Sequence, residues 1–210
     1  PRGADGNVVR FHAAANFLGS FVMDDNSFRF RSGFDDLTTL LSDLGNEQIH
    51  FIENPGNAGD ALITHSTYQI FDRLGLTVER GDRGALYPGK TLIFGGGGNF
   101  IPLYHHARTF IENNHRVCER LILLPHTVRG NEALLGALDE RCVLFAREER
   151  SYEHMRRHAP RARVHLSHDL AFLLDPGEIG KMSPLAAVPR GYGGARARLG
   201  RLARLARLRM

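Results

Sequence analysis

The feature that most constrains the fold is a regular alternation of short apolar runs with longer amphipathic segments, beginning at Gln48. The strand-length runs lie at Ile49–Ile52, Thr77–Glu79, Thr91–Phe94, Arg120–Leu124, Cys142–Ala146 and Arg163–Leu166. Helix-length segments lie between most of them, at Ala61–Leu74, Ile101–Asn114, Asn131–Asp139 and Glu149–His158. Alternation of this kind predicts an α/β domain with a Rossmann-like, mostly parallel sheet and helices on both faces.

Two glycine-rich segments follow predicted strands. Asn54–Asp60 leads from the first strand into a long helix, and Gly95–Asn99 follows the strand at Thr91–Phe94 and leads towards another predicted helix. Ligands gather at the carboxyl ends of parallel strands, where glycine lets backbone N–H groups approach an anion and a helix N-terminus favours negative charge. Neither segment is G-x-G-x-x-G, and no Gly-Lys-Ser/Thr follows, which excludes a Walker A loop.

Five short motifs carry a resemblance to a known family. In chain order they are Asn54-Pro-Gly-Asn-Ala-Gly-Asp60, Gly95-Gly-Gly-Gly-Asn99, Leu124-Pro-His-Thr127, Ala146-Arg-Glu-Glu-Arg-Ser151 and His168-Asp-Leu-Ala171. Over roughly residues 48 to 175 the sequence resembles the polysaccharide pyruvyl transferases. The resemblance implies one lobe of a fold similar to the glycosyltransferase-B architecture. It also implies transfer of a pyruvyl group from phosphoenolpyruvate to a pair of sugar hydroxyls, as a ketal, in exopolysaccharide or cell-surface glycan biosynthesis.

The resemblance also implies partners. Phosphoenolpyruvate is the expected donor substrate, with no separate cofactor, and the acceptor is a sugar or a lipid-linked glycan. The family has a second α/β lobe beyond the Asp169 region, and we expect this sequence to lack it and to be inactive alone. Two other interpretations stay open: a nucleotide-sugar glycosyltransferase of similar architecture, and a non-catalytic single-lobe remnant or interaction module.

Ketal formation needs an acid, a base and cations for the phosphate and carboxylate. We expect Asp60 to act as the base, or alternatively to cap its helix. His126, predicted in a loop after the strand at Arg120–Leu124, is the candidate proton donor, or else a structural histidine. Arg147 suits a carboxylate or phosphate clamp, or else an ion pair with Glu148 or Glu149.

The remaining candidates are expected to bind substrate. They are Asn57, Gly59, Gly96, Gly97, Gly98, Asn99, Ser151 and Asp169. Asp169 has a turn-forming role as its alternative. Four successive glycines are costly to order, which favours a backbone that approaches a ligand or another strand. No metal site is expected, because the histidines lack paired carboxylates or thiols at ligand spacing.

The chain divides into three parts. Residues 1–46, with an amphipathic helix over Asp35–Leu44, are expected to pack as an extension on the α/β domain at 47–175, and 176–210 reads as a Pro/Gly linker and basic tail. Removing the six arginines of the last fifteen residues leaves 21 basic against 23 acidic residues, so nothing argues for nucleic-acid binding.

The basic tail and the two cysteines indicate where in the cell the protein is expected. Leucines at spacing three among the arginines suit either peripheral membrane contact, or contact with an acidic partner, or a frayed terminus. No apolar run is long enough for a transmembrane helix, and the start lacks an initiator Met and a signal-peptide pattern. Cys118 and Cys142 read as reduced thiols. We therefore expect a cytoplasmic protein, located in part at the inner face of the membrane.

Overall fold

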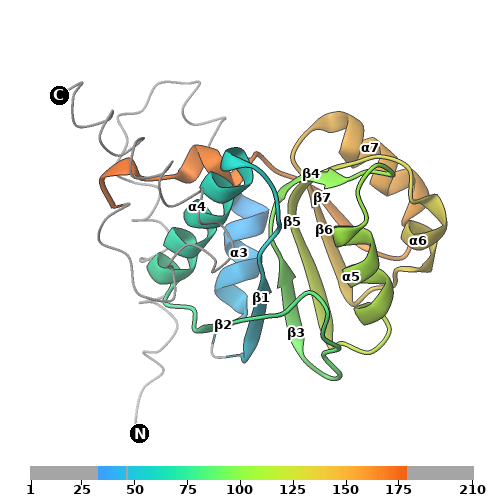
Figure 1. The fold of residues 1–210 in the computed structure, drawn as a ribbon, viewed down its shortest axis with the longest axis horizontal. Coiled ribbons are helices and arrows are strands. Elements are labelled where there is room, and N and C mark those ends of the chain that lie inside the picture. Colours follow the sequence, from blue (N-terminus) through green and yellow to red (C-terminus); the bar gives the residue numbers. More distant parts are fainter. Residues whose placement is uncertain (1–32, 46, 179–210) are drawn as a thin grey trace, which may run out of the picture.

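A seven-stranded parallel sheet with helices on both faces forms the centre of the molecule (Figure 1). The computed structural model describes residues 33–45 and 47–178. The strand order is β2-β1-β3-β5-β6-β7, with β4 pairing to β5. The strands are β1 (Ile49–Ile52), β2 (Val78–Arg80), β3 (Thr91–Phe94), β4 (Gly97–Phe100), β5 (Arg120–Val128), β6 (Cys142–Ala146) and β7 (Arg163–Leu166). The predicted fold class is therefore confirmed.

The helices follow the strands in the expected order. They are α3 (Asp35–Asp43), α4 (Ala58–Leu74), α5 (His106–Asn114), α6 (Glu132–Ala137) and α7 (Glu149–His158), followed by the 3-10 turns η1 (Leu170–Leu173) and η2 (Pro176–Glu178). Helix α4 begins earlier than predicted, because Asn57 caps it. Helix α5 begins later than predicted, because β4 occupies Gly97–Phe100 and a turn follows it.

Alternate strand residues point to opposite faces, as a pleated sheet requires, and each face has its own core. On one face Ile93, Ile122 and Phe145 pack against α3 and α4. On the other face Phe94 and Leu144 pack in the core that includes residues of α5, α6 and α7. These central strands are buried on both sides, which explains why they read as continuous apolar runs rather than as alternating patterns.

The second glycine segment lies between two strands, β3 and β4, that both pair with β5. β3 pairs with the first half of β5, and β4 pairs with its second half, through Gly97 opposite His126 and Phe100 opposite Val128. Gly95 and Gly96 form the break between them. The sequence pattern predicts a turn at Gly95–Asn99 that leads to a helix, and an end of the neighbouring strand at Leu124. Both placements are wrong: most of this segment is strand, and β5 continues through His126 to Val128.

The chain after β7 is tied back to α4. Ser66 Oγ donates to the carbonyl of Leu170, and Gln69 exchanges two hydrogen bonds of 2.8 Å with the backbone of Asp175. Helix α3 lies on the same face, with Leu37 and Leu41 in the core there. The predicted linker and basic tail lie outside the described residues, apart from Pro176–Glu178, and so does most of the predicted N-terminal extension. Within residues 33–45 and 47–178, no helix combines the length and apolarity that crossing a membrane requires.

Candidate active site

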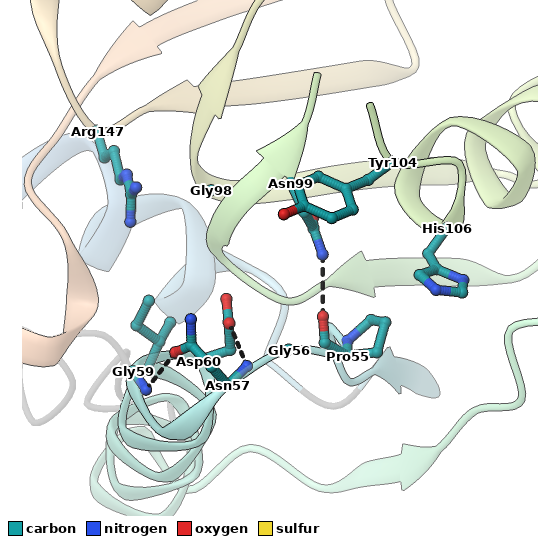
Figure 2. A pocket seen from close by; sticks show the side chains of 11 residues that line it. Pro55, Gly56, Asn57, Gly59, Asp60, Gly98, Asn99, Tyr104, His106 and Arg147 are labelled. Atoms are coloured by element: carbon teal, nitrogen blue, oxygen red, sulfur yellow. Dashed lines mark hydrogen bonds between the residues drawn. The ribbon is translucent and has the colours of Figure 1, made fainter. Parts of the chain in front are cut away.

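A pocket of about 490 Å³ opens at the carboxyl ends of the parallel strands, where both glycine segments end. Six of the predicted site residues line it: Asn57, Gly59, Asp60, Gly98, Asn99 and Arg147. Figure 2 shows Arg147 pointing from the end of β6 towards Asp60 at the start of α4. The remaining candidates, Gly96, Gly97, His126, Ser151 and Asp169, lie outside this lining.

Asp60 is held in a capping box at the N-terminus of α4. Its Oδ2 accepts from the backbone N–H of Asn57 at 2.8 Å, and Asn57 Oδ1 accepts from the N–H of Gly59 at 2.7 Å. Burial is the main reason that the pKa of Asp60 is raised above its ordinary value, against lowering by the Asn57 N–H and the Arg147 guanidinium. The carboxylate therefore caps the helix, as the alternative interpretation held, and also faces the pocket.

Two glycines make room for this carboxylate. A Cβ on Gly56 would overlap Asp60 Oδ2, and a Cβ on Gly97 would lie 2.8 Å from Asp60 Oδ1 and closer still to Asn54 Nδ2. Gly97 also has φ +154°, a backbone conformation that side chains disfavour. Glycine at these positions is thus required by protein side chains that pack against the backbone. At Gly96, by contrast, the expected close approach of another strand holds, because a Cβ there would lie 2.8 Å from the carbonyl oxygen of Pro125 in β5.

A chain of amides links the two glycine segments and ends at His126. Asn54 Nδ2 donates to the carbonyl of Gly96, and Asn54 Oδ1 accepts from Asn99 Nδ2 at 2.7 Å. Because Asn99 Nδ2 also donates to the carbonyl of Pro55, its Oδ1 is the acceptor for His126 Nε2 at 3.1 Å. The His126 ring therefore carries its proton on Nε2 and fixes Asn99. Asn54 was not predicted as a site residue, although it stands in the quoted motif.

The position of His126 changes its interpretation. The side chain is fully buried within β5, not in a loop. Burial first, and the nearby Arg147 charge second, lower the pKa of His126 to about 3. The imidazole is neutral at physiological pH, so the expectation of an imidazolium proton donor is not supported.

Arg147 is aimed into the pocket by two partners. Its Nη1 donates to Asp169 Oδ2 at 2.7 Å, and its Nε donates to Thr127 Oγ1 at 2.8 Å. Glu148 lies further away, with 3.8 Å between Arg147 Nε and the carboxylate. Asp169 also accepts from the N–H of Ala171, and so it forms the expected turn while it holds the guanidinium.

Ser151 has a structural position behind the pocket. It is fully buried in the first turn of α7, where its Oγ accepts from the N–H of Val128 at 2.8 Å and from Arg129 at 2.7 Å. Its hydroxyl donates to Glu148. Burial alone would raise the pKa of Glu148, but hydrogen bonds from Ser151, Thr127 and Arg129 outweigh it and lower that pKa. Ser151 therefore joins α7 to the end of β5.

Three lining residues, Ile63, Tyr104 and His106, were missed because no motif contains them. Tyr104 lies between β4 and α5, His106 is the first residue of α5, and both side chains are exposed at the pocket. Desolvation, with smaller effects of His105 and Arg83, lowers the pKa of His106. The late start of α5 places Tyr104 and His106 there, which periodicity did not show.

The comparisons with known proteins identify the family of the chain. A model of the family described as polysaccharide pyruvyl transferase matches residues 57–200. The chain belongs to this family. The matched stretch includes the segments Asn57–Asp60, Gly95–Asn99 and Arg147–Ser151.

A solved structure supports the same fold. The chain is similar to a functionally uncharacterised protein from Klebsiella pneumoniae subsp. pneumoniae NTUH-K2044, with 32% identity and a TM-score of 0.62. The similarity covers 77% of this chain and 61% of that one. Comparison with curated proteins found no match. The chain therefore spans about 61% of the length of the solved relative.

Proposed function

We propose that this pyruvyl transferase family domain binds phosphoenolpyruvate and transfers its pyruvyl group to a pair of sugar hydroxyls in exopolysaccharide or cell-surface glycan biosynthesis. The observation that carries the proposal is one pocket lined by both a held guanidinium and a partly desolvated carboxylate, those of Arg147 and Asp60. A guanidinium is suited to clamp the carboxylate or phosphate of the donor. A carboxylate of raised pKa is a stronger base for a sugar hydroxyl.

The roles follow from the chemistry. The first hydroxyl adds to C2 of the donor and loses its proton to Asp60, while the C3 methylene takes up a proton. The second hydroxyl then attacks C2 as the C2–O bond to phosphate breaks, and its proton passes to the departing phosphate, which closes the ketal and releases hydrogen phosphate. Among the described residues, His106 is the imidazole in the pocket lining, so we assign it the proton delivered to C3. His126 becomes a positioning residue, which holds Asn99 at the pocket wall.

Donor binding tests the proposal directly. Calorimetric titration should show that phosphoenolpyruvate binds and that a nucleotide sugar does not. Arg147→Ala should weaken donor binding roughly 10- to 100-fold, because it removes a charge-assisted contact of about 1.5–3 kcal/mol. In a version of the protein that carries the family's second lobe, Asp60→Asn should leave donor affinity near the wild-type value and lower the rate of phosphate release in the presence of acceptor glycans.

The matched control is Arg116→Ala. Arg116 is exposed and precedes β5. It therefore lies at the amino ends of the strands, whereas the pocket lies at their carboxyl ends, and its loss should not change donor affinity. Binding of a nucleotide sugar in place of phosphoenolpyruvate would instead favour a glycosyltransferase. Equal affinity of the Arg147→Ala and wild-type proteins for phosphoenolpyruvate would remove Arg147 from the donor site.

A further inference from the structure

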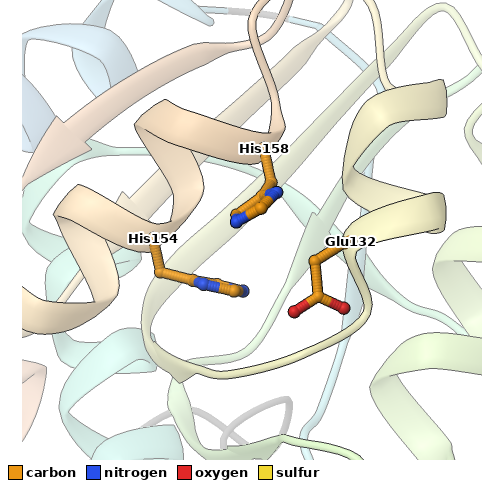
Figure 3. A group of neighbouring side chains, drawn as sticks. All are labelled: Glu132, His154 and His158. Carbon is orange, nitrogen blue, oxygen red and sulfur yellow. The ribbon is translucent and has the colours of Figure 1, made fainter.

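A second group of polar side chains lies away from the pocket, between α6 and α7. Glu132 is the first residue of α6, and His154 and His158 stand one turn apart on α7. One donor atom from each of the three lies within 4.8 Å of the others. Figure 3 shows the three side chains converging on one space from the two helices. No metal site was expected from the sequence, because the fold, not sequence spacing, brings the carboxylate to the histidines.

The histidines are arranged as metal ligands commonly are. Residues at i and i+4 lie on the same face of a helix, and the two rings have centroids 4.7 Å apart. His154 Nε2 lies 2.8 Å from the carbonyl of Gly130, which can only accept, so this contact places the ring proton on Nε2 and the lone pair on Nδ1. A ligating histidine typically donates its other N–H to a carbonyl in this way, which fixes the orientation of the ring.

The donor set favours zinc. Two imidazoles and a carboxylate suit Zn²⁺, whereas Ca²⁺ and Mg²⁺ prefer sites built from oxygen ligands alone. Both histidines are half-buried and Glu132 is exposed, so a fourth position stays open to water. The two thiols do not compete: both are buried, and burial raises the pKa of Cys118 to about 11 and of Cys142 to about 12.

We propose that Glu132, His154 and His158 form a zinc site that cross-links α6 to α7. Both helices cover the same core, with Leu135 from α6 and Met155 from α7 fully buried in it. Helix α6 has only six residues, and its N-cap Asn131 makes no side-chain cap hydrogen bond. A bound ion would fasten this short helix to its longer neighbour. A ligand that binds the folded state and not the unfolded one raises the apparent stability, so zinc should stabilise the domain.

The experiment uses the full chain, stripped of metal with a chelator. Titration with ZnCl₂ in competition with a chromophoric chelator should show one ion bound per chain, and the melting temperature should rise with zinc concentration. The His154→Asn/His158→Asn variant should lose this ion and the rise in melting temperature. Glu132→Gln should weaken zinc binding at least about tenfold, equivalent to about 1.4 kcal/mol. MgCl₂ should leave the melting temperature unchanged.

The matched control is His105→Asn/His106→Asn. These two exposed histidines also lie close together, with ring centroids 4.4 Å apart, and they are not part of the three-residue group. The control should bind zinc like the wild type. Circular dichroism without metal checks that every variant is folded. Retention of the ion by the His154→Asn/His158→Asn variant, or unchanged affinity of Glu132→Gln, would overturn the three-ligand site. Binding without any rise in melting temperature would overturn the cross-link.

Discussion

Single side chains at this site carry structural and chemical roles together. Asp60 completes a capping box and faces the pocket, and Asp169 caps a turn and holds Arg147. Sequence reasoning treated capping and function as alternatives for both residues. The structure shows that capping fixes the carboxylate of Asp60 in a set position relative to Arg147. A fixed carboxylate needs little reorganisation when charge develops in a transition state.

Because the imidazole of His126 is buried, we expect the free energy of unfolding to depend on pH. Its pKa is lowered to about 3 in the folded protein, whereas an unfolded histidine titrates near its ordinary value of about 6.5. Between these two pH values the imidazole is protonated in the unfolded state and neutral in the folded state. The contribution of His126 to the free energy of unfolding is therefore fully present above about pH 6.5 and is lost as the pH falls towards 3. The loss should be about 1.4 kcal/mol per pH unit. Urea unfolding at pH 7.5, 6 and 5 measures it.

The control for that prediction is His126→Gln, which keeps an amide donor towards Asn99 and removes the titration. Other histidines also contribute to acid sensitivity, since burial lowers the pKa of His65 and of His115. The test is therefore the difference between the two proteins. Wild type should lose free energy of unfolding faster than the variant as the pH falls from 6.5. Parallel pH profiles would show that His126 takes up its proton in the folded state.

Strand β4 places the backbone of Gly98 close to the guanidinium of Arg147. A Cβ on Gly98 would lie 2.9 Å from Arg147 Nη2, the movable end of a long side chain. Gly98→Ala should therefore displace the guanidinium, change the free energy of unfolding by less than about 1 kcal/mol and weaken phosphoenolpyruvate binding several-fold. Calorimetry and urea unfolding of the same variant measure the two effects separately.

Gly136→Ala is the control for that substitution. Gly136 lies in α6, and a Cβ there would meet its nearest neighbour, the carbonyl oxygen of His158, at an ordinary 3.7 Å. Donor affinity should be unchanged, and the helix should gain about 0.5–1 kcal/mol. If Gly98→Ala binds the donor as the wild type does, β4 does not constrain Arg147.

The elements that the sequence predicted well are those whose apolar pattern is undisturbed. The bounds of β1, β3, β6, β7 and α7 were predicted as observed, and polar or glycine residues flank β1, β3 and β6 on both sides. Strand β4 was missed, because glycine has no strand propensity and only pairing with β5 makes Gly97–Phe100 extended. The end of β5 was missed because Pro125 interrupts its apolar run.

The sequence predicted several residues that line the pocket, but not which of the candidate side chains are buried. The glycine motifs and the ends of the strands led to Asp60, Asn99 and Arg147, which do line the pocket. The sequence could not show that His126 and Ser151 point inward, because a single polar residue in a strand or in the first turn of a helix gives no signal of burial. Nor could it show the contacts of Asn54 or Glu132, which depend on residues far away in the chain.

For the whole molecule, the question is whether α3 belongs to the cooperative unit that carries the site. Leu41 is fully buried on the α3–α4 face of the sheet, and Leu135 is fully buried on the other face. Truncating either to alanine leaves a cavity and should cost about 2–5 kcal/mol. Since the same strands contribute to both cores, each substitution should shift one common unfolding transition. The chain has no tryptophan, so circular dichroism and tyrosine fluorescence are the two probes.

Thr39→Ala is the control on the same helix, because Thr39 is exposed and its loss should change stability by less than about 0.5 kcal/mol. In the Leu41→Ala variant the circular dichroism and fluorescence transitions should coincide and fall together. A separate early transition in that variant alone would mean that α3 detaches before the sheet unfolds. Coincident transitions would mean that the helix before β1 helps to keep the strands, and with them the rim that holds Asp60 and Arg147, in one rigid arrangement.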